Sequence, residues 1–405
     1  MRILFVSDVY FPRVNGVSTS INTFRTDLHR LGVDSVLVAP AYAANDGAEE
    51  PGICRVPSGR VPRDSEDRRM HWGALRRTLM QLPGRFDLVH VQTPFLAHYA
   101  GVRYAHDVGI PVVETYHTLF EEYLHHYVPV LPRLLGRVLA RQITRSQCAD
   151  VDMLVAPSEP MRVLLAQYGV RSALRVIPTG LPEDRFTPGD GQRFRAAHGV
   201  PNGRPLLLYV GRVAHEKNID FLLHSFVELR RSRPDALLLI AGEGPARAHL
   251  ASVVTALGLG QDVQFVGYLD RARGLMDCYA AADVFVFASR TETQGLVLLE
   301  AMAQGRPVVS TAVLGTASIL KSGCGAHVVP EEPAAFARAI YDILEEPARA
   351  ARLAAQGLAY ARTWASSLMA ERMIELYGDV LRAPAERGAI PGRSLASRPD
   401  LPSGA

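Results

Sequence analysis

Short apolar runs alternate with amphipathic helical segments along nearly the whole chain. Runs of this kind, rich in Val, Ile and Leu, predict parallel strands that helices cover on both faces. The runs of the first half are RILFVSD (2–8), SVLVAP (35–40), DLVHVQ (87–92), PVVETYH (111–117), DMLVAPS (152–158) and LRVIPTG (174–180). Those of the second half are PLLLYVG (205–211), ALLLIAG (236–242), VQFVGYL (263–269), DVFVFAS (283–289), RPVVST (306–311) and AHVVP (326–330). The pattern predicts an α/β protein with two doubly wound parallel sheets.

A polar stretch, TPGDGQRFRAAHGVPNGRP (187–205), separates the two series and is rich in Gly and Pro, as interdomain connections are. We therefore expect one domain over residues 1–186 and a second over residues 206–360. Residues 361–383 are expected to form helices that cross back to the first domain. The tail, residues 384–405, has little apolar content and is expected to be disordered. Open α/β sheets bind ligands beyond the carboxyl ends of their strands, which places the expected site in a cleft between the domains.

The composition of the chain argues against several classes of protein. Of 405 residues 48% are hydrophobic, and the formal net charge of +3 gives no overall field that would favour nucleic acid. Four cysteines lie far apart, so neither a zinc site nor a disulfide framework is expected, and a reducing, cytoplasmic setting fits. The amino-terminal run lacks a cleavage pattern, and no stretch reaches the roughly eighteen apolar residues of a membrane span.

The turn after the first strand argues against a dehydrogenase. Instead of G-x-G-x-x-G the chain reads SDVYFPRVNGVSTSINTF, with a single glycine, Gly16, before a predicted helix. Gly16 either serves a loop conformation that other residues avoid or lets a phosphate approach the backbone. A lone glycine does not decide between these interpretations.

Two cations follow the first strand of the second domain, in YVGRVAHEKNIDFLLHSF (209–226). Lysine occurs in this chain only at positions 217 and 321, so Lys217 departs from the general use of arginine. Arg212 and Lys217 are either solvated surface cations or ligands for an anion at the mouth of the cleft.

Two glutamates stand out in RTETQGLVLLEAMAQGRPVV (290–309). Glu292 lies in a loop after a predicted buried strand, and Glu300 lies in an apolar helix that starts at Gly295. A buried carboxylate costs several kcal/mol unless donors surround it. The hydroxyls of a sugar or a ribose supply such donors. The alternative for Glu300 is an ion pair with Arg290 or Arg306.

Together these segments resemble the retaining GT-B glycosyltransferases that share the E-x7-E motif, the family 4 group. The resemblance spans essentially residues 1–380. It rests on PRVNGV (12–17), ETYHT (114–118), GRVAHEKN (211–218), GEGP (242–245) and TETQGLVLLEAMAQGRPVV (291–309). It implies two Rossmann-like domains facing a central cleft, the first binding the acceptor and the second a nucleotide sugar.

The resemblance also implies roles for individual residues. Glu292 would bind hydroxyls of the donor sugar, Glu300 the nucleotide ribose, and His117 a sugar hydroxyl near the reacting carbon. Arg212 and Lys217 would hold the diphosphate and meet the charge that develops on it. The remaining expected donor contacts are Gly16, Thr293, Gln294, Gly295 and Leu296.

The implied reaction needs no cofactor. His117, Glu292, Arg212 and Lys217 form the expected catalytic set, and the cleft loops hold no D-x-D pair for a metal. Members of the family retain the anomeric configuration, with front-face attack assisted by the leaving diphosphate. A phosphorylase would need a lysine that carries its cofactor near the cleft, and only Lys217 and Lys321 are available. A non-enzymatic nucleotide-binding module is the remaining alternative outside the transferases.

The acceptor is expected to be a lipid, because the segments are most similar to those of diacylglycerol α-glucosyltransferases. UDP-glucose is the preferred donor. A GDP-mannose-dependent mannosyltransferase, and a transferase for a soluble or polysaccharide acceptor, remain alternatives.

Residues 131–147, LPRLLGRVLARQITRSQ, predict how such an enzyme reaches its acceptor. Arg133, Arg137, Arg141 and Arg145 recur every four residues and form a basic stripe on a helix. Apolar residues beside the stripe give the character of an interfacial helix, and RRMHWGALRRTLMQ (68–81) repeats the mixture. We expect peripheral binding to an anionic membrane, at the inner face of the plasma membrane. Alternatively, the leucines pack on the sheet and the arginines remain in water.

Overall fold

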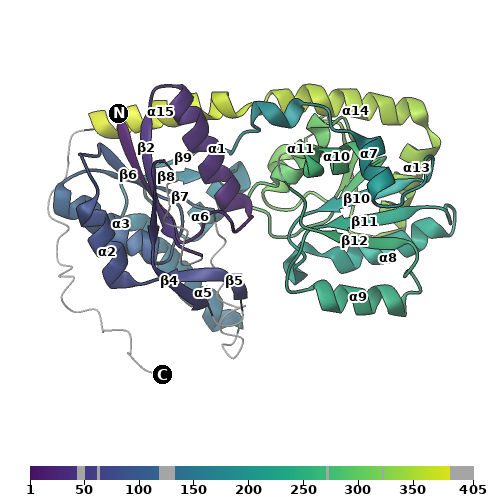
Figure 1. Ribbon diagram of the computed structural model, residues 1–405, viewed down its shortest axis with the longest axis horizontal. Helices are drawn as coiled ribbons and strands as arrows, with labels where there is room; N and C mark the ends of the chain where they lie inside the picture. The colour runs from purple at the N-terminus through teal and green to yellow at the C-terminus, as the bar shows by residue number, and fades with distance from the viewer. Residues whose placement is uncertain (43–50, 62–63, 118–132, 271–272, 322, 384–405) are drawn as a thin grey trace.

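The structure, a computed structural model, consists of two lobes side by side, each built around one parallel sheet (Figure 1). It describes residues 1–42, 51–61, 64–117, 133–270, 273–321 and 323–383, with the backbone alone for residues 64–67 and 133–134. The expected tail, residues 384–405, lies outside the described ranges.

The amino-terminal sheet has seven parallel strands in the order β3-β2-β1-β6-β7-β8-β9. Its strands are β1 (Arg2–Val6), β2 (Asp34–Pro40), β3 (Ile53–Val56), β6 (Leu88–Val91), β7 (Val112–Thr115), β8 (Met153–Ala156) and β9 (Leu174–Val176). Successive side chains of a strand point to opposite faces. Ile3 and Phe5 accordingly pack in one core, and Leu4 and Val6 pack in another.

Helices cover both faces of this sheet. The core of Ile3 and Phe5 is closed by α1 (Gly16–Arg30) and α15 (Ser366–Arg382). The opposite core is closed by α2 (Trp72–Gln81), α3 (Leu96–Val108), α5 (Arg133–Ala149) and α6 (Glu159–Gln167). Most of the segment 361–383 is therefore α15, which packs on the first lobe.

The carboxy-terminal sheet has six parallel strands in the order β12-β11-β10-β13-β14-β15. Its strands are β10 (Leu206–Val210), β11 (Leu237–Ala241), β12 (Val263–Gly267), β13 (Val284–Phe287), β14 (Val308–Ser310) and β15 (Ala326–Val328). The helical segments are η2 (His215–Lys217), α8 (Ile219–Arg230), α9 (Arg247–Ala256), α10 (Gly274–Ala281), α11 (Leu296–Ala303), α12 (Thr316–Ile319), α13 (Pro333–Glu345) and α14 (Pro347–Arg362). The strand order reverses between β10 and β13, where doubly wound sheets bind ligands. The prediction of two doubly wound parallel sheets is confirmed.

Three strands were not expected. They are β3 and an antiparallel hairpin of β4 (Ser58–Val61) and β5 (Asp64–Met70). β3 is a short edge strand, and β5 reads DSEDRRM, so neither shows the apolar run that marks a buried strand.

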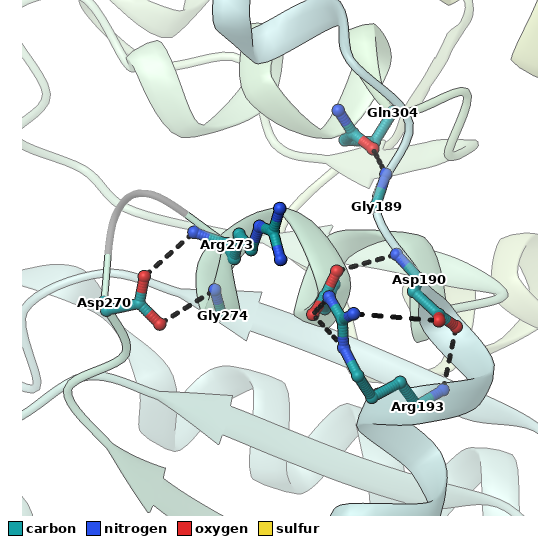
Figure 2. A network of polar contacts seen from close by, with 8 residues as sticks. Gly189, Asp190, Arg193, Asp270, Arg273, Gly274 and Gln304 are labelled. Carbon is teal, nitrogen blue, oxygen red and sulfur yellow. Dashed lines mark hydrogen bonds and ion pairs between the residues drawn. The ribbon is translucent and has the colours of Figure 1, made fainter.

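The expected linker, residues 187–205, belongs to the second lobe. It contains α7 (Gly191–Ala197), and Phe194 and Val200 pack in the core of that lobe. Gly189 and Gly191 reflect close packing, because a Cβ there would lie 2.2 Å from the Met276 carbonyl oxygen and 2.4 Å from the Ala280 carbonyl oxygen, respectively. Figure 2 shows the same stretch anchored by Gln304, whose Oε1 accepts from the Gly189 N–H at 2.9 Å.

The chain crosses between the lobes earlier, at residues 177–181. Ile177 packs in the first lobe and Leu181 in the second. The returning crossing runs beside it: the Leu181 N–H donates to the Trp364 carbonyl (2.7 Å), and the Ser366 N–H donates to the Leu181 carbonyl (2.9 Å). A Cβ on Gly180 would lie 2.4 Å from the Ser366 Cα, so the two crossings pack too closely for a side chain at position 180.

Candidate active site

The carboxyl ends of the two sheets face each other. Ser158, which follows β8 of the first lobe, donates its hydroxyl to the carbonyl of Thr293, which follows β13 of the second (2.7 Å). The side chain of Gln294 hydrogen-bonds the backbone of Thr179. The loops after the strands of both sheets therefore meet between the lobes.

Arg212, Lys217 and Glu292 converge at the switch point of the second sheet. Arg212 and Lys217 follow β10, and Glu292 follows the neighbouring strand β13. Lys217 Nζ lies 2.5 Å from Glu292 Oε1, and the two side chains are 17% and 20% exposed. Arg212 lies in the same loop, with Nη1 3.8 Å from Glu216 Oε1. The structure thus brings Lys217 and Glu292 together in a partly buried setting, with Arg212 in the same loop as Lys217.

The GEGP segment holds this loop in place. A Cβ on Gly242 would lie 2.0 Å from the Gly211 carbonyl oxygen, and one on Gly244 would lie 2.4 Å from the Val213 carbonyl oxygen. Both glycines also have positive φ, 136° and 156°. Only glycine therefore allows the backbone after β11 to pack against the loop that carries Arg212 and Lys217.

Glu300 lies inside α11 and is 3% exposed. Its Oε2 accepts a hydrogen bond from the hydroxyl of the buried Tyr279 of α10 at 2.9 Å. The two arginines of the expected alternative, Arg290 and Arg306, bond elsewhere. Arg290 forms its ion pair with Glu331, and Arg306 donates to the carbonyls of Gln304 and Ala282.

The start of α11 lies beside both carboxylates. Gly295 caps the helix with φ of 98°, and Leu296 is the first helical residue. Thr293 packs against Gly315, where a Cβ would lie 2.2 Å from the Thr293 carbonyl carbon. The amide of Gln294 is bonded to Thr179, so its contact is with the protein backbone.

The first lobe contributes the start of α1. Asn15 caps this helix and accepts a hydrogen bond from the Ser18 N–H at 2.8 Å. Gly16 is exposed, lacks a positive φ, and a Cβ there would meet nothing within 4 Å. The conformational interpretation of Gly16 therefore does not apply, and a close backbone approach remains.

His117 follows β7 at the carboxyl edge of the first sheet. Its Nε2 lies 3.1 Å from Gln92 Oε1, so Nε2 carries the proton and Nδ1 is left as an acceptor. Burial lowers the pKa of His117 to about 4, which keeps the ring neutral at pH 7. A neutral imidazole with a free acceptor suits a hydrogen bond from a sugar hydroxyl.

Ionisable groups cluster beneath this edge. His98 Nδ1 lies 2.9 Å from Glu114 Oε2, and its Nε2 lies 3.7 Å from Asp150 Oδ2. Burial alone would lower the pKa of His98, but Glu114 and Asp150 outweigh it and raise the pKa to about 9. Burial raises the pKa of Asp8 to about 6, although Thr93 donates a hydrogen bond to it at 2.7 Å.

Helix α5 exposes its larger apolar side chains. Its buried side carries Ala140, Thr144, Gln147 and Cys148. Leu135, Val138 and Leu139 are 55%, 59% and 44% exposed.

The arginines of the basic stripe accompany these exposed apolar residues. Arg137, Arg141 and Arg145 are exposed, and the Arg141 guanidinium stacks over the Tyr168 ring at 4.9 Å. The side chain of Arg133 lies outside the described part of the chain. The expected alternative, in which the leucines of this helix pack on the sheet, does not hold for Leu135 and Leu139.

The described residues contain neither a cluster of metal ligands nor a membrane-spanning helix. Among them, no group of three or more His, Cys, Asp or Glu side chains could hold a metal ion. Within the same described ranges, no helix has both the length and the apolar character needed to cross a membrane.

Sequence reasoning missed the partners of the site residues. Tyr279 and Gln92, which bond Glu300 and His117, lie 21 and 25 residues away along the chain. Gln92 ends a predicted strand at the carboxyl edge, which is a usable signal. Tyr279 lies in an apolar helix, and nothing in its local sequence marks it.

Both halves of the chain are similar to known glycosyltransferases. Residues 14–185 match the family model described as Glycosyltransferase Family 4, and residues 190–359 match the one described as Glycosyl transferases group 1. An alpha-monoglucosyldiacylglycerol synthase of Streptococcus pneumoniae is 33% identical over 317 residues, 76% of this chain and 71% of that protein.

Two further similarities extend the comparison. A GDP-mannose-dependent alpha-(1-6)-phosphatidylinositol dimannoside mannosyltransferase of Mycobacterium tuberculosis is 27% identical, covering 91% of this chain and 95% of its own. The structure of sucrose-phosphate synthase from Thermosynechococcus elongatus aligns with a TM-score of 0.77 at 23% identity, covering 94% and 98% of the two chains, and supports the fold alone. The chain therefore belongs to the GT-B glycosyltransferases with a family 4 amino-terminal domain and a group 1 carboxy-terminal domain.

Proposed function

We propose that this glycosyltransferase moves a hexose, with retention of configuration and without a metal, from a nucleotide sugar to a membrane lipid. UDP-glucose is the preferred donor and diacylglycerol the preferred acceptor. The observation that carries the proposal is the Lys217–Glu292 pair at the switch point of the second sheet, in a chain 33% identical to an alpha-monoglucosyldiacylglycerol synthase.

The pair suits a donor that brings both hydroxyls and phosphate. Lys217 Nζ and Glu292 Oε1 lie 2.5 Å apart and neutralise each other. A nucleotide sugar offers hydroxyl donors to the carboxylate and phosphate oxygens to the ammonium, so each partner gains a ligand contact. Glu300 is buried one turn after the start of α11 and would accept hydrogen bonds from the ribose hydroxyls.

The reaction places negative charge on the departing diphosphate and positive character on the sugar ring. Arg212 and Lys217 would meet the diphosphate charge, together with the free N–H groups at the starts of α1 and α11. His117, neutral and presenting Nδ1 as an acceptor, would hold a sugar hydroxyl. In the proposed front-face step, the acceptor hydroxyl attacks on the side the diphosphate leaves, and a diphosphate oxygen takes its proton.

The lipid acceptor is supported by α5. A helix that exposes Leu135, Val138 and Leu139 among arginines has the composition of an interfacial helix. Each arginine near an anionic surface contributes about 1 kcal/mol, so the attraction would be reversible and sensitive to salt.

A second candidate is transfer of mannose from GDP-mannose, favoured by the similarity to the mycobacterial mannosyltransferase over 91% of this chain. The names of both relatives include a lipid, but the sugar differs, glucose in one and mannose in the other. Transfer to a soluble or polysaccharide acceptor is a third candidate, which the assays must distinguish from the first two.

A donor-by-acceptor screen tests the proposal. UDP-glucose, UDP-galactose and GDP-mannose are each offered with diacylglycerol vesicles and with soluble sugars, and products are identified by mass and anomeric configuration. We expect an α-linked hexosyl lipid from UDP-glucose in the presence of a chelator, and none from Glu292→Ala. Turnover that the chelator abolishes and magnesium or manganese restores would contradict the metal-free reaction.

Flotation with phosphatidylglycerol vesicles tests the membrane surface. We expect binding at low salt, and its loss when Arg137 and Arg141 are both changed to Glu. A matched control changes Arg352 and Arg362, two exposed arginines of α14 in the second lobe, to Glu and should leave flotation unchanged. Undiminished flotation and lipid glycosylation in the Arg137, Arg141 variant would rule out docking through α5.

A further inference from the structure

The side chain of Gln294 bridges the donor loop and the hinge. The Thr179 N–H donates to Gln294 Oε1 at 2.8 Å, and Gln294 Nε2 donates to the Thr179 carbonyl at 2.6 Å. Gln294 is 5% exposed and Thr179 is 3% exposed. Both polar atoms of the Gln294 amide thus bond the backbone of Thr179. Gln294 itself lies two residues after Glu292.

Thr179 lies at the point where the chain passes between the lobes. The residue two before it, Ile177, packs in the first lobe, and Leu181 packs in the second. The returning crossing is hydrogen-bonded to Leu181 on both its N–H and its carbonyl. The amide of Gln294 therefore holds one of two adjacent crossings, where a small change in backbone angle would rotate one lobe against the other.

The same contact continues into the first lobe. Thr179 Oγ1 lies 2.7 Å from the hydroxyl of Ser20, a buried residue of α1. The amino terminus of α1, at Gly16, is one of the proposed diphosphate contacts. On the other side of the donor loop, Ser158 donates to the Thr293 carbonyl at 2.7 Å. A continuous set of hydrogen bonds links the loop of Glu292 to the helix of Gly16.

We propose that Gln294 is a positioning residue, which fixes the loop of Glu292 relative to α1 by clamping the hinge at Thr179. This inference rests on the proposed function and revises the expectation that the Gln294 side chain contacts the donor. The second lobe carries Arg212, Lys217, Glu292 and Glu300, and the first lobe adds only the start of α1. Breaking the clamp should therefore weaken the binding of a free nucleoside diphosphate only slightly. Transfer of the sugar, in contrast, requires the loop of Glu292 and the first lobe to be held in a fixed relative position.

Gln294→Glu gives the sharpest test. A protonated carboxylic acid has one donor and one acceptor and can replace the amide at Thr179, whereas a carboxylate would face the Thr179 carbonyl with no proton to donate. We expect kcat to fall about tenfold or more near pH 8 and to recover relative to the wild type as the pH is lowered towards about 5.5. The affinity for free UDP, measured by calorimetry, should stay within about threefold of the wild type.

Gln304→Glu is the matched control. Gln304 is also buried, and its Oε1 accepts from the Gly189 N–H at 2.9 Å (Figure 2). Its Nε2 donates to the carbonyls of Arg185 and Thr187 at 2.6 and 2.9 Å. The segment that Gln304 holds does not connect the two lobes. We expect this variant to lose stability while its kcat follows the wild-type pH profile.

Hydrogen exchange gives a readout independent of turnover. At about pH 8, Gln294→Glu should speed exchange of the Thr179 amide and of loop 290–295, and Gln304→Glu should not. Gln294→Asn is too short to span the same contact, and at every pH it should show the low kcat and fast exchange that Gln294→Glu shows at about pH 8.

The outcomes separate the two claims. A wild type that transfers no sugar, while exchange changes as described, contradicts the proposed function and leaves the clamp standing. A wild type that is active, with Gln294→Glu matching its kcat and exchange at about pH 8, overturns the clamp. A parallel loss of kcat in the Gln304→Glu control, or a loss of UDP affinity equal to the loss of kcat, would also overturn it.

Discussion

Replacing Glu300 tests whether its buried carboxylate binds the nucleotide or only stabilises the fold. Its side chain is 3% exposed, and Tyr279 donates one hydrogen bond to it at 2.9 Å. If Glu300 also accepts from the ribose, Glu300→Ala removes a charge-assisted hydrogen bond worth about 1.5–3 kcal/mol. We therefore expect the affinity for free UDP to fall about ten- to a hundredfold.

Turnover at saturating donor should be much less affected, because Glu292, Lys217 and Arg212 remain. Calorimetry with UDP gives the affinity, and initial rates over a range of donor concentrations separate KM from kcat. The expected signature is a raised KM with kcat reduced by less than about threefold.

Tyr279→Phe is the control, since it removes the same internal hydrogen bond and leaves the carboxylate. Losing that bond should lower the free energy of unfolding by about 1–3 kcal/mol, with UDP affinity changed by less than about threefold. A folded Glu300→Ala variant that binds UDP like the wild type would refute the ribose contact and make Glu300 a structural residue.

Three further predictions concern separate parts of the molecule. Glu292→Ala and Lys217→Ala should each reduce kcat by at least about a hundredfold, measured by product formation, because each removes one member of the pair at 2.5 Å; a variant of either residue with wild-type kcat contradicts that assignment. Gly16→Ala should keep its melting temperature, because a Cβ there meets nothing within 4 Å, yet lose donor turnover; unchanged turnover would remove Gly16 from the diphosphate site. The raised pKa of His98, about 9 against 6.5, corresponds to about 3 kcal/mol of stability that is fully present below pH 6.5 and lost as the pH rises through 9. Urea unfolding from about pH 6 to 10 should show this decline, and Glu114→Gln should flatten it; equal slopes in both proteins would contradict the assignment.

The strands and the placement of the loops could be predicted because they depend on short, local patterns. The run DVFVFAS predicts a strand by its apolar content, and Glu292 follows it at the carboxyl edge. The run PLLLYVG places Arg212 and Lys217 in the same way. Neighbouring parallel strands then bring these residues together, which required only the order of a doubly wound sheet.

The partners of these residues could not be predicted in the same way. The donor to Glu300 comes from Tyr279 on a different helix, and the amide of Gln294 is satisfied by Thr179, 115 residues away. Such contacts depend on how helices and lobes pack, and no local pattern records them. Gly189 and Gly191 illustrate the converse, since in sequence they resemble part of a flexible linker but in the structure they pack closely against α10.

The most direct test of the account is a crystal structure with UDP bound. The account predicts ribose hydroxyls within hydrogen-bond distance of Glu300, and phosphate oxygens at Arg212 and Lys217 beyond the carboxyl ends of β10 and β13. Nucleotide bound elsewhere, with the Lys217–Glu292 pair intact and Glu300 still enclosed by protein alone, would contradict it.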